Sequence, residues 1–168
     1  MPEQETVERA ERDKEQGKSP STQAGEFVRE EMHHVREGKH GARSPQQAIA
    51  IGLSKARRAG VKLGAPKRGR STNRIRKQAQ RDLAKGRSGK RRVSPRRSRA
   101  TENALKKESR SAASKSALAR QARGAAKRRG RPSLHNAAMK AVRTKGKQGL
   151  RRAGRKAAQT RQRHARSR

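Results

Sequence analysis

The chain has 168 residues, of which 49 are Lys or Arg and 13 are Asp or Glu, so its formal net charge is +36. Leu, Ile, Val and Phe make up only about 10% of the residues, below the share of roughly 20% at which a highly charged chain is expected to be disordered. With no Cys, no Trp, no Tyr and one Phe, it lacks thiolate metal sites, disulfides and stacking platforms for unpaired bases. This composition argues against a globular enzyme and indicates a polyanionic partner.

Charge and large apolar side chains are both unevenly distributed along the chain. Residues 1–43 hold ten acidic and eight basic side chains, whereas residues 44–168 hold three acidic and 41 basic ones. Nine of the 20 Val, Ile, Leu, Met and Phe residues lie between Phe27 and Leu63. We therefore expect a polar, disordered leader (1–18) without a signal peptide, a small ordered unit (19–63) and a long, basic, largely disordered tail (64–168).

The ordered unit is predicted to be a hairpin of two helices. The first begins at Ser19-Pro20, a capping residue followed by a proline suited to the first helical turn, and Gly38 can end it. The second begins at Ser44-Pro45-Gln46-Gln47, in the capping-box pattern, and ends before Gly60. Apolar residues recur at helical spacing in both segments: Ala24, Phe27, Val28, Met32 and Val35, then Ile49, Leu53 and Ala56.

A hairpin of 45 residues is marginal for independent folding. A third helix at 71–85, where Ile75, Ala79 and Leu83 lie four residues apart, could cover it. A homodimer through residues 19–63 is the other route, and the sequence does not favour either. The expected fold class is therefore a mostly disordered protein with a small all-α unit, followed by the basic tail.

Two stretches of the ordered unit resemble a known group of proteins. The segments at 22–34 (TQAGEFVREEMHH) and 44–61 (SPQQAIAIGLSKARRAGV) resemble a group of small, basic bacterial proteins of uncharacterised function. The resemblance covers about residues 19–66. It implies a bacterial source, and it carries over no catalytic or binding residue.

The best motif of the tail is Lys127-Arg128-Arg129-Gly130-Arg131-Pro132, whose Arg-Gly-Arg-Pro core resembles the AT-hook. In that motif Gly lets the backbone lie on the floor of a narrow minor groove, the two Arg side chains run along the groove, and Pro keeps the chain extended. The flanking Lys127 and Arg128 would meet phosphates. The alternative is that these residues form a basic linker between two conditional helices.

Other parts of the tail resemble linker-histone tails in composition. Ser94-Pro95-Arg96-Arg97 resembles the Ser-Pro-basic-basic turns that lie in A·T-rich minor grooves, although basic residues surround every Ser in this region. Stretches rich in Ala, Lys and Arg at 118–127, 134–145 and 150–163 could become helical once phosphates neutralise their charge.

Catalytic and metal chemistry find little support in the sequence. His33, His34 and His40, beside Glu30 and Glu37, are the available metal ligands, but adjacent histidines point to different faces of a helix and no thiolate assists. We expect these histidines to be solvated and predict no metal site, no cofactor and no enzymatic activity.

The sequence predicts a DNA-binding protein that coats and condenses duplex DNA in the cytoplasm, at the bacterial nucleoid, with a mild A·T preference. An RNA-binding or ribosome-associated protein is the alternative, because Arg-rich segments also bind RNA. Arg57 and Arg58, at the end of the second helix, could add contacts to DNA. A membrane partner is disfavoured, because the chain has no long apolar face.

Overall fold

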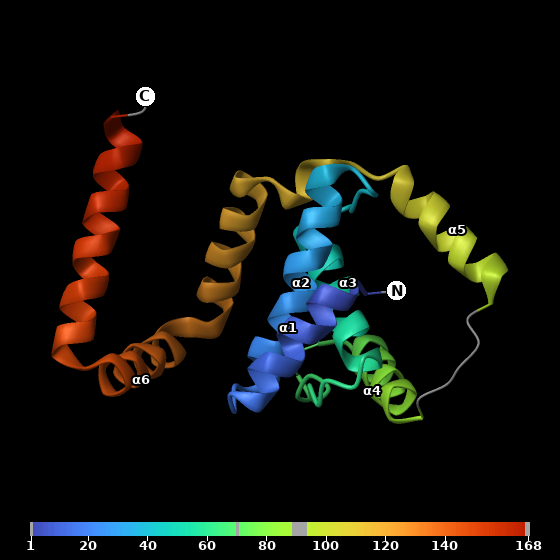
Figure 1. Ribbon diagram of the computed structural model, residues 1–168, viewed down its shortest axis with the longest axis horizontal. Coiled ribbons are helices and arrows are strands. Elements are labelled where there is room, and N and C mark those ends of the chain that lie inside the picture. Colours follow the sequence, from blue (N-terminus) through green and yellow to red (C-terminus); the bar gives the residue numbers. More distant parts are fainter. Residues whose placement is uncertain (1, 70, 89–93, 167–168) are drawn as a thin grey trace. The chain divides into compact units, whose positions relative to one another are not determined.

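The computed structural model describes residues 2–69, 71–88 and 94–166, and about four fifths of them are helical (Figure 1). The prediction of a mostly disordered chain is therefore wrong. The contacts divide the chain into two compact units, residues 1–121 and residues 122–168. The helices are α1 (Gln4–Glu15), α2 (Pro20–Glu37), α3 (Pro45–Arg58), α4 (Asn73–Arg87), α5 (Pro95–Lys106), the short 3₁₀ helix η1 (Arg110–Ala113) and α6 (Lys115–Arg166).

The hairpin predicted at 19–63 is present as α2 and α3. Ser19 is the N-cap residue of α2, and Gly38 ends that helix in the left-handed conformation. Ser44 caps α3, because its hydroxyl oxygen accepts a hydrogen bond from the backbone N–H of Gln47 at 3.2 Å. The Gln47 side chain in turn accepts one from the backbone N–H of Arg43, at 2.8 Å, one residue before the position that the capping-box pattern predicts.

The leader expected to be disordered instead forms α1, which packs against α2. Its buried positions are Thr6 and Ala10, and Ala10 joins an apolar cluster with Ala24, Phe27, Ala56 and Val61. Ion pairs hold the helix in place, among them Arg9 Nε with Glu26 Oε2 at 2.9 Å. Besides Ala10, only the half-buried Val7 of α1 packs on this apolar cluster, and most other residues of the helix are charged or polar, so its composition resembles that of a solvated leader.

The third helix predicted at 71–85 is present as α4, and it packs against α3. Thr72 caps it, with its hydroxyl accepting from the backbone N–H of Ile75 at 3.4 Å. A second apolar cluster lies between α2, the start of α3 and η1, and includes Met32, Val35, Ala48, Ala112 and Ala113. The hairpin is therefore covered within the chain by α1, α4 and η1, and this burial does not require the homodimer considered from the sequence.

Small residues bring these helices unusually close. A Cβ atom added at Gly52 would lie 2.7 Å from the Cα atom of Val28, so only glycine lets α3 cross α2 at this distance. Among the residues that the structure describes, eight of the 12 buried apolar side chains are alanines. A count of Leu, Ile, Val and Phe therefore underestimates this core, since alanine fills the space between closely packed helices without large side chains.

The segment expected as a disordered tail, 64–168, is mostly helical where it is described, with positions 70, 89–93 and 167–168 outside the described residues. Within α6 the backbone is non-helical at Gly130 (φ 74°, ψ 167°) and Gly146 (φ 61°, ψ 177°), so three helical segments follow one another. The three predicted conditional helices fall into these segments. Among the described residues, no helix combines the length and apolar character needed to span a bilayer.

A pair of glycine substitutions tests the close crossing of α2 and α3. Gly52→Ala should lower the free energy of unfolding by about 1–3 kcal/mol, because the new methyl group overlaps the α2 backbone. Gly25→Ala, at an exposed site of α2 with no atom within 4 Å of the added Cβ, should raise it by about 0.5–1 kcal/mol. Urea unfolding followed by circular dichroism measures both, and equal effects would contradict the crossing.

Candidate nucleic-acid interface

The three acidic residues between positions 44 and 168 are all paired with cations. Asp82, which is 1% exposed, accepts hydrogen bonds from Ser54 Oγ at 2.7 Å and from Arg58 Nε at 2.8 Å. Glu102 pairs with Lys106 one helical turn away, at 2.8 Å, and Glu108 lies 3.5 Å from Arg43. These carboxylates neutralise individual cations, and the chain has no acidic residue after Glu108.

Both arginines proposed as hairpin contacts have structural partners. Arg57 is 7% exposed, and its guanidinium donates to the backbone carbonyl oxygens of Leu63 at 3.1 Å and of Leu53 and Gly64 at 3.4 Å. Burial lowers the pKa of this guanidinium. The structure disfavours the possible DNA contact at Arg57, because the side chain is buried and its donors hold the 61–64 segment against α3. Arg58 remains half exposed but joins α3 to Asp82 of α4.

Ser94-Pro95-Arg96-Arg97 forms the start of α5. Ser94 is the N-cap residue, Pro95 occupies the first turn, and Arg96 and Arg97 are exposed in that turn. The turn expected from the resemblance to linker histones is thus replaced by a helix N-terminus. The two arginines are accessible to a ligand, but they belong to a helical surface.

The hook-like motif surrounds the first interruption of α6. Lys127, Arg128 and Arg129 end one helical segment, Gly130 has a positive φ that favours glycine, and Arg131 and Pro132 begin the next segment. All five residues other than Gly130 are exposed. The backbone leaves the helical conformation at Gly130 alone, so the extended strand of an AT-hook is absent and the arrangement matches the linker alternative.

Positive charge is concentrated in the second unit. Residues 122–168 contain 17 Lys or Arg and no Asp or Glu. Every one of these cations whose side chain the structure describes is exposed. Several lie one turn apart, such as Arg151 and Arg155 or Arg152 and Lys156, where like charges destabilise a helix. An anion bound along these residues would relieve that repulsion.

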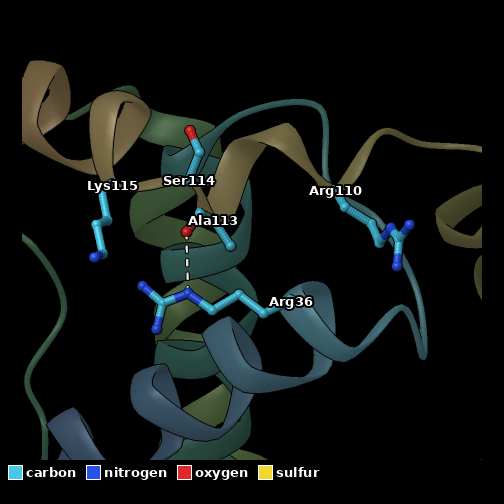
Figure 2. Close-up of a pocket in the computed structure, with 5 residues that line it drawn as sticks. All are labelled: Arg36, Arg110, Ala113, Ser114 and Lys115. Atoms are coloured by element: carbon cyan, nitrogen blue, oxygen red, sulfur yellow. Dashed lines mark hydrogen bonds between the residues drawn. The ribbon is translucent and has the colours of Figure 1, made fainter.

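A second cationic feature lies at the start of α6 within the first unit. Arg36, Arg110, Ala113, Ser114 and Lys115 line an open cavity of about 440 Å³. In Figure 2, Arg36 Nε donates to the carbonyl oxygen of Ala113 at 3.1 Å, Lys115 extends beside the same guanidinium, and Arg110 extends in a different direction. Ser114 caps α6 by accepting from the backbone N–H of Ala117 at 3.2 Å. Arg36, Lys115 and the positive end of a helix thus share one surface.

Sequence reasoning missed this cavity because its residues come from α2, η1 and α6. The available signal was the Ser114-Lys115-Ser116-Ala117 stretch, in which a capping Ser precedes an Ala-rich run and so marks a helix start. Nothing in the sequence indicates that Arg36, 77 positions before Ala113, lies beside it.

The histidines expected to be solvated differ from one another. His33 is exposed, but the side chains of His34 and His40 are 12% and 14% exposed, with ring centroids 6.0 Å apart. His34 Nε2 lies 2.9 Å from Glu3 Oε1. That hydrogen bond and, as the next largest cause, a hydrogen bond from Lys39 lower the pKa of Glu3 to about 2. The prediction of solvation is therefore wrong for His34 and His40.

Comparisons with protein-family models, curated proteins and solved structures yield no match to this chain. The site is therefore interpreted from its own residues.

The role of Arg58 can be tested by unfolding. Arg58→Gln should lower the free energy of unfolding by about 1.5–3 kcal/mol, because it removes a charged hydrogen bond from the buried Asp82 carboxylate. Arg97→Gln, which removes an exposed cation from α5, should change it by less than about 0.5 kcal/mol. Thermal or urea unfolding compares the two variants, and a neutral Arg58→Gln would show that the ion pair is dispensable.

Proposed function

We propose that this chain is a DNA-binding protein that coats and condenses duplex DNA through its basic C-terminal helix. One observation carries the proposal: residues 122–168 contain 17 Lys or Arg residues and no Asp or Glu. The resemblance of residues 19–66 to small bacterial proteins supports the bacterial nucleoid as the place of action. The cationic segment that would bind DNA is thus helical, and not disordered as expected from the sequence.

Electrostatics favours a nucleic acid over a compact anion. Duplex DNA carries one negative charge per about 1.7 Å of its axis, and each neutralised phosphate releases counterions. A helix rises about 1.5 Å per residue, so the 20 residues from 147 to 166 extend about 30 Å. A row of exposed Arg and Lys over that length can meet several successive phosphates. Because these side chains repel one another in the free helix, binding also stabilises the helix itself.

The cavity at the start of α6 provides a separate phosphate contact in the proposed complex. Arg36 uses Nε for the Ala113 carbonyl, which leaves the other guanidinium N–H groups for a ligand. Lys115 supplies a second cation, and a helix N-terminus attracts anions through its dipole. This contact would orient the first unit on the DNA backbone without reading sequence.

A mild A·T preference is part of the proposal and is assigned to Arg129 and Arg131. Narrow A·T-rich minor grooves have an enhanced negative potential that attracts inserted arginine side chains. Gly130 interrupts the helix between these two exposed residues, so Arg129 ends one helical segment and Arg131 begins the next. Arginine suits such insertion better than lysine because its guanidinium is planar and weakly hydrated.

A triple substitution tests binding through α6. Arg151→Gln, Arg152→Gln and Arg155→Gln together should reduce the slope of log K against log salt by up to about 2.7, since each lost phosphate contact contributes about 0.9. Gln has nearly the helix propensity of Arg, so the helix itself should persist. Fluorescence anisotropy with a labelled duplex at several salt concentrations gives the slope.

The matched control removes the same charge from the first unit. Arg12→Gln, Lys14→Gln and Arg29→Gln change exposed cations of α1 and α2 and should leave the slope nearly unchanged. Equal reductions in both triple variants would mean that net charge alone controls binding. Tighter binding to an RNA duplex of the same length would favour the alternative partner.

A second pair of variants tests groove recognition. Changing Arg129 and Arg131 to Lys keeps the charge and should lower affinity for an A·T-tract duplex by about 1–3 kcal/mol, with little change on a G·C duplex. The control, Arg151→Lys with Arg155→Lys, should leave the ratio of the two affinities unchanged. Competition titration at one salt concentration measures both, and an unchanged ratio in the first variant would contradict minor-groove insertion.

A further inference from the structure

One cluster of metal-ligating side chains lies outside the proposed DNA interface. Glu31 and His34 are on α2, and His40 is in the loop that follows it. One donor atom from each of the three residues lies within 4.8 Å of the other two. From this geometry we propose that Glu31, His34 and His40 bind a divalent transition-metal ion of the zinc type.

The Glu31 carboxylate is the strongest indication. Its side chain is 1% exposed, and among the described residues neither oxygen has a partner at the angle of a proper hydrogen bond. Lys55 Nζ lies 2.7 Å from Oε2, and His40 Nε2 lies 3.0 Å from Oε1, so both approaches are close but poorly directed. A buried carboxylate with undirected partners is costly unless a cation completes its coordination.

The hydrogen bond on the other side of the His40 ring decides which nitrogen can bind metal. His40 Nδ1 lies 3.0 Å from the carbonyl oxygen of Gly41, which can only accept, so Nδ1 carries the proton. In the neutral ring, the lone pair of Nε2 then faces the lone pairs of Glu31 Oε1. A metal ion between them converts this repulsion into two coordinate bonds. Zinc-binding histidines usually donate their second N–H to such a carbonyl or carboxylate.

The distances fit one ion. Zinc lies about 2.0–2.1 Å from nitrogen and oxygen ligands, so two ligands of the same ion are about 2.9–3.4 Å apart. The 3.0 Å between Glu31 Oε1 and His40 Nε2 is within that range. A donor atom of His34 lies within 4.8 Å of the other two, so coordination requires this side chain to move closer to them. Glu3, at 2.9 Å from His34 Nε2, places a further carboxylate at this ring.

The surrounding charges favour a dication. Three carboxylates gather here, from Glu3, Glu30 and Glu31, against the two ammonium groups of Lys39 and Lys55. With neutral imidazole rings the group has one excess negative charge. Imidazole and carboxylate together suit zinc, cobalt and nickel, whereas magnesium and calcium prefer oxygen ligands alone. Bound metal would tie the 38–42 loop to α2, as a structural clip independent of DNA binding.

Metal titration of the full chain tests the proposal. Zn²⁺ added to metal-free protein should bind with a stoichiometry of one, measured by competition with a chromogenic chelator. A hundredfold excess over the dissociation constant should raise the melting temperature by about 5 °C or more. Co²⁺ should give the visible absorption of a site with nitrogen ligands, and Mg²⁺ and Ca²⁺ should not change the melting temperature.

Adjacent histidines provide a matched pair of variants. His40→Gln and His34→Gln should each weaken Zn²⁺ binding at least tenfold, while His33→Gln, exposed on the same helix, should leave it unchanged. Circular dichroism of each metal-free variant separates loss of binding from loss of fold. Equal weakening by His33→Gln, or no saturable site in the wild-type chain, would overturn the proposal.

Discussion

The arrangement of the first three helices depends on one partly buried ammonium group. Lys55 of α3 lies 3.0 Å from Glu30 and 2.7 Å from Glu31, two α2 carboxylates that are each 1% exposed. Burial alone would raise the pKa of Glu30, but the hydrogen bond and charge of Lys55, together with hydrogen bonds from Thr6 and Glu3, outweigh this effect and the pKa falls. Glu30 also accepts from the backbone N–H of Glu3 at 3.1 Å, so the same charge cluster positions α1. Loss of this one cation would leave two buried carboxylates without the ammonium group that they share.

The helical hairpin could be predicted because its signals are local. Ser19, Gly38 and Ser44 mark helix ends through the conformations and hydrogen bonds of single residues, and the structure has those ends. The leader and the tail could not be predicted in this way. In α1 the stabilising contacts are ion pairs to residues more than 15 positions away, such as Arg9 with Glu26, and composition does not reveal such pairs. In α6 the sequence located the interruptions, but net charge suggested that the segments between them would be unfolded.

For the same reason, some features of the candidate interface could be predicted from the sequence and others could not. The charge of α6 and the position of the hook-like motif follow from the sequence alone. Whether an individual cation is free to bind DNA does not follow from the sequence, because it depends on whether a carboxylate or carbonyl group lies nearby in space. Arg57 is surrounded by three backbone carbonyls, while Lys115 lies in an open cavity, although both occur in similar basic stretches. The contact of Glu31 with His40 spans nine positions and a change from helix to loop, and therefore leaves no periodic signal.

The alanine-rich core has a thermodynamic consequence. The heat capacity change of unfolding grows with the apolar area that becomes exposed, and typical domains show about 12–15 cal/mol/K per residue. Because eight of the 12 buried apolar residues that the structure describes are alanines, unfolding of the first unit exposes little apolar area for its length. Its heat capacity change should fall below that range, and its curve of stability against temperature should be correspondingly flat. Cooling would then cost this protein less stability than it costs a domain built on Leu and Ile.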